Sequence, residues 1–519
     1  MAYKMMLGNA SSEGDEKVAQ RSHTRSADAG FEHLDVLVVG AGLSGIDAAC
    51  RLQTGSPDRR FAIFEARDAI GGTWDLFRYP GVRSDTDMST LGFPFRPWRD
   101  DRAIAEGGEI RDYVRETARS CGVDRLVRLR HRVISADWSE AEARWTVEYE
   151  AEGQCRRLTC GFLFMCAGYY DYSEGHAPRW PGTSDFVGRM IHPQFWPDEI
   201  DLRKKRVVVI GSGATAVTLV PALVREGAGH VTMLQRSPTY ILSVPSEDRL
   251  AIRWRKLLPS GFADTLIRWK NIALGIFFYN LARRRPAAFK RMLARSQGRI
   301  LGPELVTAHL TPRYEPWDQR LCLVPDNDLF KVLKSGEASI VTDTIERFTP
   351  GGLQLTSGAT LPADIIVTAT GLKIRVMGGI HLTLDGAPVE VASRMLYRGA
   401  MLEAVPNFAL AVGYTNASWT LRCDLSARFV SRLLNHMARR GLASARPEAA
   451  PGMRGEAPML DLRSGYIERA AAMLPRQGLK PPWRVRQNYV RDMLGFGTSR
   501  MNDGVLRFEK AGNKGQTAT

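Results

Sequence analysis

The sequence lacks the cysteine and histidine patterns that mark disulfide-bonded domains and metal sites. Its seven cysteines are an odd number, and no two of them have C-x-x-C spacing. The nine histidines form no H-E-x-x-H or similar cluster. We therefore expect neither a disulfide framework nor a metal site, and we predict the reducing cytoplasm as the compartment. The cysteines are Cys50, Cys121, Cys155, Cys160, Cys166, Cys322 and Cys423.

Long apolar runs are also missing. A helix that crosses a bilayer needs about 18 or more consecutive apolar residues. The longest candidate, 272–281, is about half that length and is followed by three arginines. Residues 1–33 are rich in Ser, Ala, Glu, Asp and Arg and have no apolar core. We interpret them as a disordered extension and not as a targeting signal.

Acidic residues are scarce in one part of the chain. The net charge is +15 over 519 residues, which could indicate a nucleic-acid binder. However, residues 251–300 contain twelve Lys or Arg and one acid, Asp264, which is a surplus of 11. Because the segment has helical periodicity, the favoured interpretation is a helical lid that buries its apolar face on the core and leaves its charges in solvent. The alternative, suggested by basic residues beside aromatic and apolar ones, is peripheral contact with an anionic membrane at the inner face, and no nucleic-acid partner is expected.

A glycine-rich G-x-G-x-x-G turn follows the first predicted strand, 34–39, and precedes a predicted helix. Such a turn lets a pyrophosphate approach the N–H groups at a helix N-terminus. The next strand, 61–64, ends in Glu65, and a carboxylate there accepts hydrogen bonds from a ribose 2′-hydroxyl. This unit is predicted to bind FAD or NAD. Its turn consists of Gly40, Ala41, Gly42, Leu43, Ser44 and Gly45.

The same pattern recurs after the predicted strand 206–210. Arg236 stands 25 residues after the first glycine of this turn, as Glu65 does in the first unit. An arginine can bind the 2′-phosphate that a glutamate repels, and Ser237 lies beside it. We therefore predict that the second unit binds NADP, and the alternative is a solvated surface arginine. Its turn consists of Gly211, Ser212, Gly213, Ala214, Thr215 and Ala216.

Two dinucleotides of different types in one chain indicate electron transfer from NADPH to a flavin. Two further apolar strands, 163–168 and 364–371, end in a small residue and glycine, as expected beside bound dinucleotides. A dithiol reductase needs a redox-active cysteine pair, and none is present. The main remaining possibility is that the reduced flavin passes its electrons to O2.

Residues 186–197 read F-V-G-R-M-I-H-P-Q-F-W-P and match the pattern F-x-G-x-x-x-H-x-x-x-W-P just before the second glycine-rich turn. Together with the loops 71–74 and 78–85, they make the chain resemble the Baeyer–Villiger monooxygenases from about residue 34 to 508. The resemblance implies FAD and NADPH as cofactors, and O2 and small apolar ketones as substrates. Through a C4a-peroxyflavin such enzymes convert ketones to esters or lactones, and S-oxygenation of thioamides and sulfides is implied as well.

The resemblance also implies roles for residues. Arg320 corresponds to the arginine that keeps the flavin peroxide anionic, and Asp85 is expected to orient it. His192 is counted with these catalytic residues, although coupling of domain motion is its favoured role. Gln319 replaces a lysine that many members use for the 2′-phosphate, which weakens the case for NADP. The further FAD positions are Gly72, Thr73, Trp74, Asp75, Leu76, Arg83, Ser84, Asp85 and Val133, and the further NADP positions are Val217 and Thr218.

The predicted fold class is α/β, with two Rossmann-like dinucleotide-binding domains and a helical insertion. The FAD-binding domain is expected over 34–170 and 375–508, and the NADP-binding domain over 171–240 and 317–374. The basic helical subdomain is expected over 241–316, and a flexible tail over 509–519.

Several alternatives stay open at this stage. The enzyme could be an N- or S-oxygenating flavin monooxygenase without ketone activity, or the chain could be a non-enzymatic flavoprotein held at a membrane. Arg320 could serve only in a structural salt bridge. Trp74 and Trp419 could be packing residues instead of pocket walls.

Overall fold

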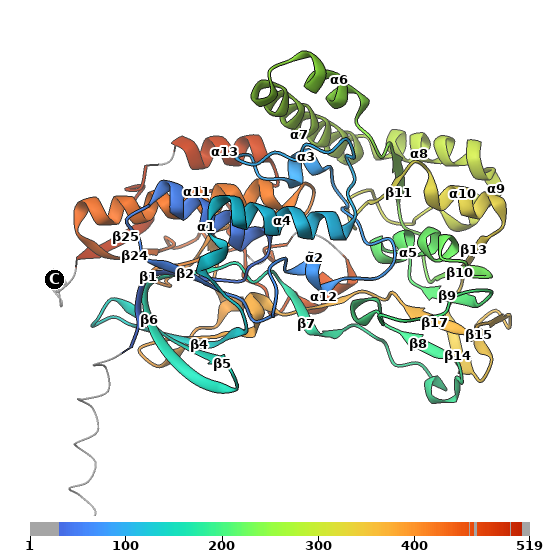
Figure 1. The fold of residues 1–519 in the computed structure, drawn as a ribbon, viewed down its shortest axis with the longest axis horizontal. Coiled ribbons are helices and arrows are strands. Elements are labelled where there is room, and N and C mark those ends of the chain that lie inside the picture. Colours follow the sequence, from blue (N-terminus) through green and yellow to red (C-terminus); the bar gives the residue numbers. More distant parts are fainter. Residues whose placement is uncertain (1–30, 456, 461–463, 499, 511–519) are drawn as a thin grey trace, which may run out of the picture.

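The computed structural model describes residues 31–455, 457–460, 464–498 and 500–510, and Figure 1 shows their arrangement. The predicted extension 1–33 lies outside these residues except for its last three. The first strand already begins at His33, one residue before the predicted start. Two α/β units lie side by side, and a group of helices runs along one edge of both (Figure 1).

The larger sheet belongs to the first unit and has nine strands in the order β20-β19-β4-β5-β6-β1-β2-β3, with β23 beside β6. Strands β6, β1, β2 and β3 run parallel. Val36 and Val38 of β1 face one core, and Leu37 and Val39 face another, which explains an almost continuous apolar run. The strands are β1 (His33–Val39), β2 (Phe61–Phe64), β3 (Val127–Arg128), β4 (His131–Ser139), β5 (Arg144–Ala151), β6 (Gln154–Met165), β19 (His381–Leu384), β20 (Ala387–Pro388) and β23 (Phe408–Leu410).

Helices cover one face of this sheet. The glycine-rich turn leads directly into α1 (Leu43–Gly55), which packs lengthwise on α11 (Trp419–Arg440). Gly122 takes the left-handed conformation with φ 70° and ends α4 (Gly107–Cys121), which also contacts α1. Helices α1 and α11 therefore place residues that are far apart in sequence near the end of β1, where the glycine-rich turn begins.

The smaller sheet has five parallel strands in the order β13-β10-β9-β17-β8. Val207 and Val209 of β9 face a core covered by α5 (Ala214–Arg225) and α10 (Asp328–Ser335). Val208 and Ile210 face a second core, which the antiparallel sheet of β14 (Ile345–Thr349), β15 (Gly352–Leu355) and β16 (Thr360–Pro362) helps to build. The five strands are β8 (Arg189–Ile191), β9 (Arg206–Ile210), β10 (His230–Gln235), β13 (Ala338–Thr342) and β17 (Ile365–Thr368). The predicted fold class of two Rossmann-like units is thus confirmed.

The chain crosses between the units twice, and the two crossings pair with each other. β7 (Tyr170–Gly175) runs out of the first unit, and β18 (Leu372–Ile374) runs back antiparallel to it. This two-stranded connection links the two units, and the domain boundaries stay a prediction.

The insertion consists mainly of four helices, α6 (Arg249–Leu257), α7 (Ser260–Arg284), α8 (Pro286–Leu301) and α9 (Pro303–His309). The sequence predicted a helical segment from residue 241 onward, but the first residues of the insertion form a strand, β11 (Ile241–Val244). This strand pairs parallel with β12 (Cys322–Pro325), which supplies its backbone hydrogen-bond partners. Across the part of the chain that the structure describes, no helix has an apolar stretch long enough to span a bilayer.

The C-terminal part returns to the first unit. β24 (Leu442–Pro447) pairs with β25 (Leu506–Lys510), so the strand includes two residues that were expected to lie in the flexible tail from 509 onward. Backbone pairing with β24 fixes these residues, and the rest of the predicted tail lies outside the described residues. The remaining elements near the site are α2 (Thr73–Leu76), α3 (Met88–Leu91), α12 (Gly465–Ala470) and α13 (Tyr489–Thr498), and the short strands β21 (Leu396–Tyr397) and β22 (Met401–Leu402) pair with each other.

Candidate functional site

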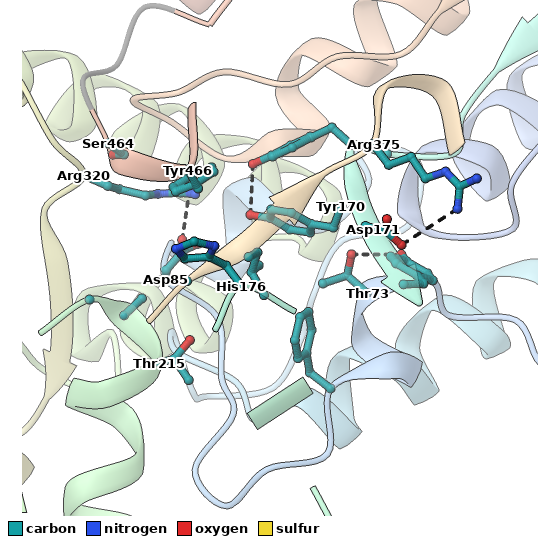
Figure 2. A pocket seen from close by; sticks show the side chains of 18 of the residues that line it. Thr73, Asp85, Tyr170, Asp171, His176, Thr215, Arg320, Arg375, Ser464 and Tyr466 are labelled. Carbon is teal, nitrogen blue, oxygen red and sulfur yellow. Dashed lines mark hydrogen bonds and ion pairs between the residues drawn. The ribbon is translucent and has the colours of Figure 1, made fainter. Parts of the chain in front are cut away.

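A cavity of about 1100 Å³ opens between the two α/β units. Small-molecule sites are usually about 300–1000 Å³, so this one is large enough for more than a single small ligand. Both glycine-rich turns, the connection β7–β18 and residues near β12 and α12 line it. Figure 2 shows Arg320 and Asp85 on one side of the cavity, with Tyr170 and Tyr466 beside them.

The first glycine-rich turn is built as a close cradle. Gly40 has φ +105°, and a Cβ there would lie 2.6 Å from the carbonyl oxygen of Cys166. A Cβ at Gly45 would lie 1.8 Å from the carbonyl oxygen of Gly40. Gly42 faces the cavity and has room on that side, since the nearest atom to its Cβ position is Gly72 Cα at 3.5 Å. The turn therefore brings bare backbone to the cavity at the start of α1, as a pyrophosphate site requires.

Glu65 lies at the end of β2 and is buried at the cavity wall. Its Oε2 accepts a 2.7 Å hydrogen bond from the Ala41 N–H, and its Oε1 accepts one of 2.9 Å from the Arg67 N–H. Burial raises the pKa of this carboxyl, and the two backbone hydrogen bonds oppose that shift. Each carboxylate oxygen keeps a further acceptor position, so the group remains suited to a ribose hydroxyl.

The second glycine-rich turn has the same backbone but carries Ala216 where the first has Gly45. Gly211 has φ +140°, and a Cβ there would lie 2.3 Å from the carbonyl oxygen of Ala369, while a Cβ at Gly213 would meet nothing within 4 Å. Ser212 Oγ donates a 3.1 Å hydrogen bond to the carbonyl oxygen of Ser237. Arg236 is exposed at the cavity edge, and no acidic side chain among the described residues forms an ion pair with it. This guanidinium is available for a phosphate.

Arg320 and Asp85 form the ion pair that the sequence led us to expect. Arg320 Nη2 lies 2.9 Å from Asp85 Oδ2, and both side chains line the cavity (Figure 2). Burial lowers the pKa of Arg320, but Asp85 and nearby tyrosines outweigh this effect, so the pKa is raised overall. The guanidinium is consequently a permanent positive charge held in one place.

Three tyrosines surround this ion pair, and the sequence analysis missed them. Tyr169 and Tyr170 share a 3.0 Å hydrogen bond between their hydroxyls, and Tyr466 comes from α12. Burial raises the pKa of each hydroxyl, so all three remain neutral at physiological pH. Tyr169 and Tyr170 directly follow Gly168 at the end of a predicted strand, so their place near the cofactor could have been predicted from the sequence. No sequence pattern indicates that Tyr466 lies at the site, because it is far along the chain.

Two further groups at the cavity wall were also missed, His176 and Arg375. Figure 2 shows Arg375 directed toward Asp171, and their closest charged atoms are 4.0 Å apart. Burial lowers the pKa of His176, and neighbouring Arg469 and Lys373 lower it further. His176 is therefore neutral at physiological pH.

Most of the predicted site residues line this cavity. They are Gly40, Gly42, Ser44, Glu65, Gly72, Thr73, Trp74, Arg83, Ser84, Asp85, Val133, Gly211, Ser212, Gly213, Ala214, Thr215, Thr218, Arg236, Ser237 and Arg320. Gln319 and Trp419 line it as well. Trp419 Nε1 donates a 2.9 Å hydrogen bond to Ser44 Oγ, so this tryptophan is both a wall of the cavity and part of its support.

Five predicted cofactor residues lie outside the cavity lining. Gly45, Ala216 and Val217 pack their helices onto the strands, and Leu76 packs against the core of the second unit. Asp75 is buried, with ion pairs of 2.6 Å to Arg67 and 2.8 Å to Arg115. Arg78 is a third partner at 3.7 Å, and low exposure with three arginine partners makes Asp75 a support for α2 instead of a direct cofactor contact.

His192 is also outside the cavity, which corrects its grouping with the catalytic residues. Its Nδ1 accepts a 3.2 Å hydrogen bond from the Gln194 N–H, and its ring lies against Gly175 of β7. Burial lowers its pKa. The ring of His192 therefore packs against the connection between the units at Gly175, and its coupling of domain motion stays a prediction.

Comparisons with known proteins agree with this arrangement. The family described as flavin-binding monooxygenase-like matches residues 33–270. The FAD-containing monooxygenase EthA of Mycobacterium tuberculosis (strain ATCC 25618 / H37Rv) is 51% identical over 92% of this chain and 98% of its own length. EthA of Mycolicibacterium smegmatis is 48% identical over the same shares of both chains.

Solved structures show the same fold at low sequence identity. The oxidized steroid monooxygenase bound to NADP has a TM-score of 0.73 at 21% identity, covering 92% of this chain and 100% of its own. The open crystal structure of cyclohexanone monooxygenase has a TM-score of 0.71 at 20% identity, with the same coverage.

Proposed function

Because the chain belongs to the flavin-binding monooxygenase-like family, we propose that it is a Baeyer–Villiger monooxygenase that depends on FAD and NADPH. Its substrates are O2 and small apolar ketones, which it converts to esters or lactones by inserting one oxygen atom beside the carbonyl. Thioamides and sulfides form a second substrate class, oxygenated at sulfur.

The residues at the first glycine-rich turn fit FAD. The N-terminal end of α1 offers backbone N–H groups to the pyrophosphate across Gly40 and Gly42, and Glu65 is positioned for a ribose hydroxyl. Ser44 and Thr73 line the cavity next to this turn and can hydrogen-bond the cofactor. FAD supplies the redox step between NADPH and O2 when it is bound.

The second turn fits NADPH. Exposed Arg236 with Ser237 suits the 2′-phosphate, and the N-terminal end of α5 suits the pyrophosphate. Gln319 also lines the cavity but carries no charge, so in this chain Arg236 bears the discrimination between NADPH and NADH.

The observation that carries the proposal is the Arg320–Asp85 ion pair inside the cavity between the two turns. Addition of an oxygen nucleophile to a ketone places negative charge on the carbonyl oxygen. A fixed guanidinium stabilises that charge without reorganising, because Asp85 already holds it in place. The neutral tyrosines around it add no competing charge. This arrangement favours ketone oxygenation over oxidation of sulfur alone.

The direct test is product analysis with purified protein, NADPH and a panel of linear, cyclic and aryl ketones, one thioamide and one sulfide. We expect esters or lactones from at least one ketone class. Sulfur products alone would favour the S-oxygenating alternative. FAD without any NADPH-driven O2 consumption would instead indicate a non-enzymatic flavoprotein.

We also expect Arg320→Ala to retain FAD and to oxidise NADPH while ester formation falls about 100-fold or more. Its control is Arg157→Ala, because Arg157 pairs with Glu148 at 2.5 Å on the larger sheet, away from the cavity. An unchanged ester yield in Arg320→Ala would remove Arg320 from the mechanism.

A further inference from the structure

The helical insertion exposes an unusual number of large apolar side chains. Eight of the sixteen exposed large hydrophobic residues among the described residues lie between 250 and 292. Scattered single residues of this kind need no explanation, but a concentration on consecutive helices does. They are Leu250, Leu257, Phe262, Trp269, Leu274, Phe277, Phe278 and Met292.

The most exposed of them lie at the corner between α6 and α7. Leu257 is 68% exposed and Phe262 is 60% exposed, on either side of the turn at Pro259. Figure 1 shows α6 and the neighbouring part of α7 standing above the body of the molecule, at the top of the view. This corner therefore carries the two most exposed apolar side chains of the insertion.

The helices already use another face to pack on the core. Ala263, Ile267 and Ile272 of α7 are buried. Arg268 reaches inward and donates hydrogen bonds to the carbonyl oxygens of Ser89 (2.9 Å) and Gly92 (2.7 Å). The expected lid that buries its apolar face accounts for these side chains but leaves apolar surface in solvent, above all at Leu257 and Phe262.

The charged side chains of the insertion also form two groups, one paired within the protein and one exposed to solvent. Five of the twelve basic side chains of residues 251–300 are bound inward or to acids, such as Lys290 to Glu315 at 2.7 Å. The one acid of this segment, Asp264, is buried against Arg99 and Arg255. The other seven basic residues form no ion pair within the described part of the chain, and they are Arg253, Lys256, Arg284, Arg285, Arg291, Arg295 and Arg299.

The unpaired bases flank the exposed apolar residues. Arg253 and Lys256 lie on α6 just before Leu257, and Arg284 and Arg285 follow Phe277 and Phe278 at the end of α7. Arg291, Arg295 and Arg299 recur every four residues and so line one face of α8. Figure 1 shows α6, α7 and α8 along the same edge of the molecule.

We infer that this edge, formed by α6, the outer side of α7 and α8, is a docking surface for an anionic lipid membrane. The apolar corner enters the boundary between headgroups and acyl chains, while the bases stay at the level of the negative headgroups. A polyanion such as DNA would satisfy the bases but would leave Leu257, Phe262 and Phe277 in water. The combination of charge and apolar exposure therefore selects lipid.

The test is flotation of the FAD-loaded protein with vesicles of phosphatidylcholine alone and of phosphatidylcholine with 30% phosphatidylglycerol. We expect binding only to the anionic vesicles, and release in about 0.5 M salt, where charges are screened within about 4 Å. The double variant Arg253→Glu/Lys256→Glu should lower the partition coefficient at least about tenfold. Leu257→Ser/Phe262→Ser should lower it by a similar factor, because two large apolar side chains are removed from the boundary.

Matched controls separate this surface from general effects of charge and hydrophobicity. Arg119→Glu/Arg125→Glu makes the same change of charge at exposed positions on and after α4. Met473→Ser/Leu479→Ser removes two apolar side chains with 50% and 58% exposure elsewhere. Both controls should bind vesicles as the wild type does, and all four variants should keep FAD and NADPH oxidation. Absence of vesicle binding by the wild type at low salt, equal loss in the controls, or binding of duplex DNA instead would overturn the assignment.

Discussion

The two glycine-rich turns occupy equivalent places in two similar sheets, but they differ in the space that each leaves for a side chain at its third position. The first is closed at its third position, where a Cβ on Gly45 would lie 1.8 Å from the carbonyl oxygen of Gly40, and Glu65 is buried and hydrogen-bonded to two backbone N–H groups. The second is open at that position, where Ala216 carries a Cβ, and Arg236 is exposed. The difference suits a cofactor that stays bound in the first unit and one that must enter and leave the second in every cycle.

The largest effect is expected at the third position of the turns. Gly45→Ala puts a Cβ 1.8 Å from the Gly40 carbonyl oxygen, so the turn must move. We expect a loss of about 2–3 kcal/mol in the free energy of unfolding and loss of bound FAD. Urea unfolding and the ratio of flavin to protein absorbance measure both.

The matched change in the second turn is Ala216→Gly, since Ala216 is the natural residue at the equivalent position. It should cost only about 0.5–1 kcal/mol, from added backbone freedom, and should leave FAD in place. Equal effects of the two changes would contradict the contrast between a closed and an open turn.

A second effect concerns Arg236. Arg236→Ala should raise the KM for NADPH roughly 10- to 100-fold, because one charge-assisted interaction with the 2′-phosphate is lost. The KM for NADH and the FAD content should stay close to wild type. Steady-state kinetics with both nucleotides measure the change, and an equal rise for both would show that Arg236 does not read the 2′-phosphate.

The smallest effect concerns His192, which joins the two units. Because burial lowers its pKa below the ordinary 6.5, the unfolded chain binds this proton more readily than the folded one. Its contribution to stability is therefore complete above about pH 6.5 and declines as the pH falls below it. His192→Gln should lose less Tm than wild type between about pH 7.5 and pH 5.5, which thermal unfolding of both proteins at the two pH values measures.

Turnover by His192→Gln at pH 7.5 should stay within about twofold of wild type, because the ring lies outside the cavity. A loss of product formation with FAD still bound would restore a catalytic role for His192.

Sequence patterns predicted most of the fold around the cofactors. Both glycine-rich turns follow a buried parallel strand and precede a helix, because local backbone requirements and strand burial are written in consecutive residues. The exceptions lie where partners are distant. No strand was predicted at β11, because its pairing partner, β12, follows 78 residues later. The flexible tail was predicted to begin inside β25, because the pairing of β25 with β24 is not visible in the local sequence.

The sequence by itself determined the residues that carry the chemistry and their spacing. These are the two glycine-rich turns, Glu65 after the first and Arg236 after the second, and Arg320 together with the pattern at residues 186–197. These depend on short-range backbone geometry and on the charge of single residues. Only the tertiary structure decided which groups share the cavity. It brought Tyr466 to Arg320, removed His192 and Asp75 from the lining, and turned part of the basic insertion outward. The reason is that burial and side-chain partners depend on contacts between distant segments, which no local pattern records.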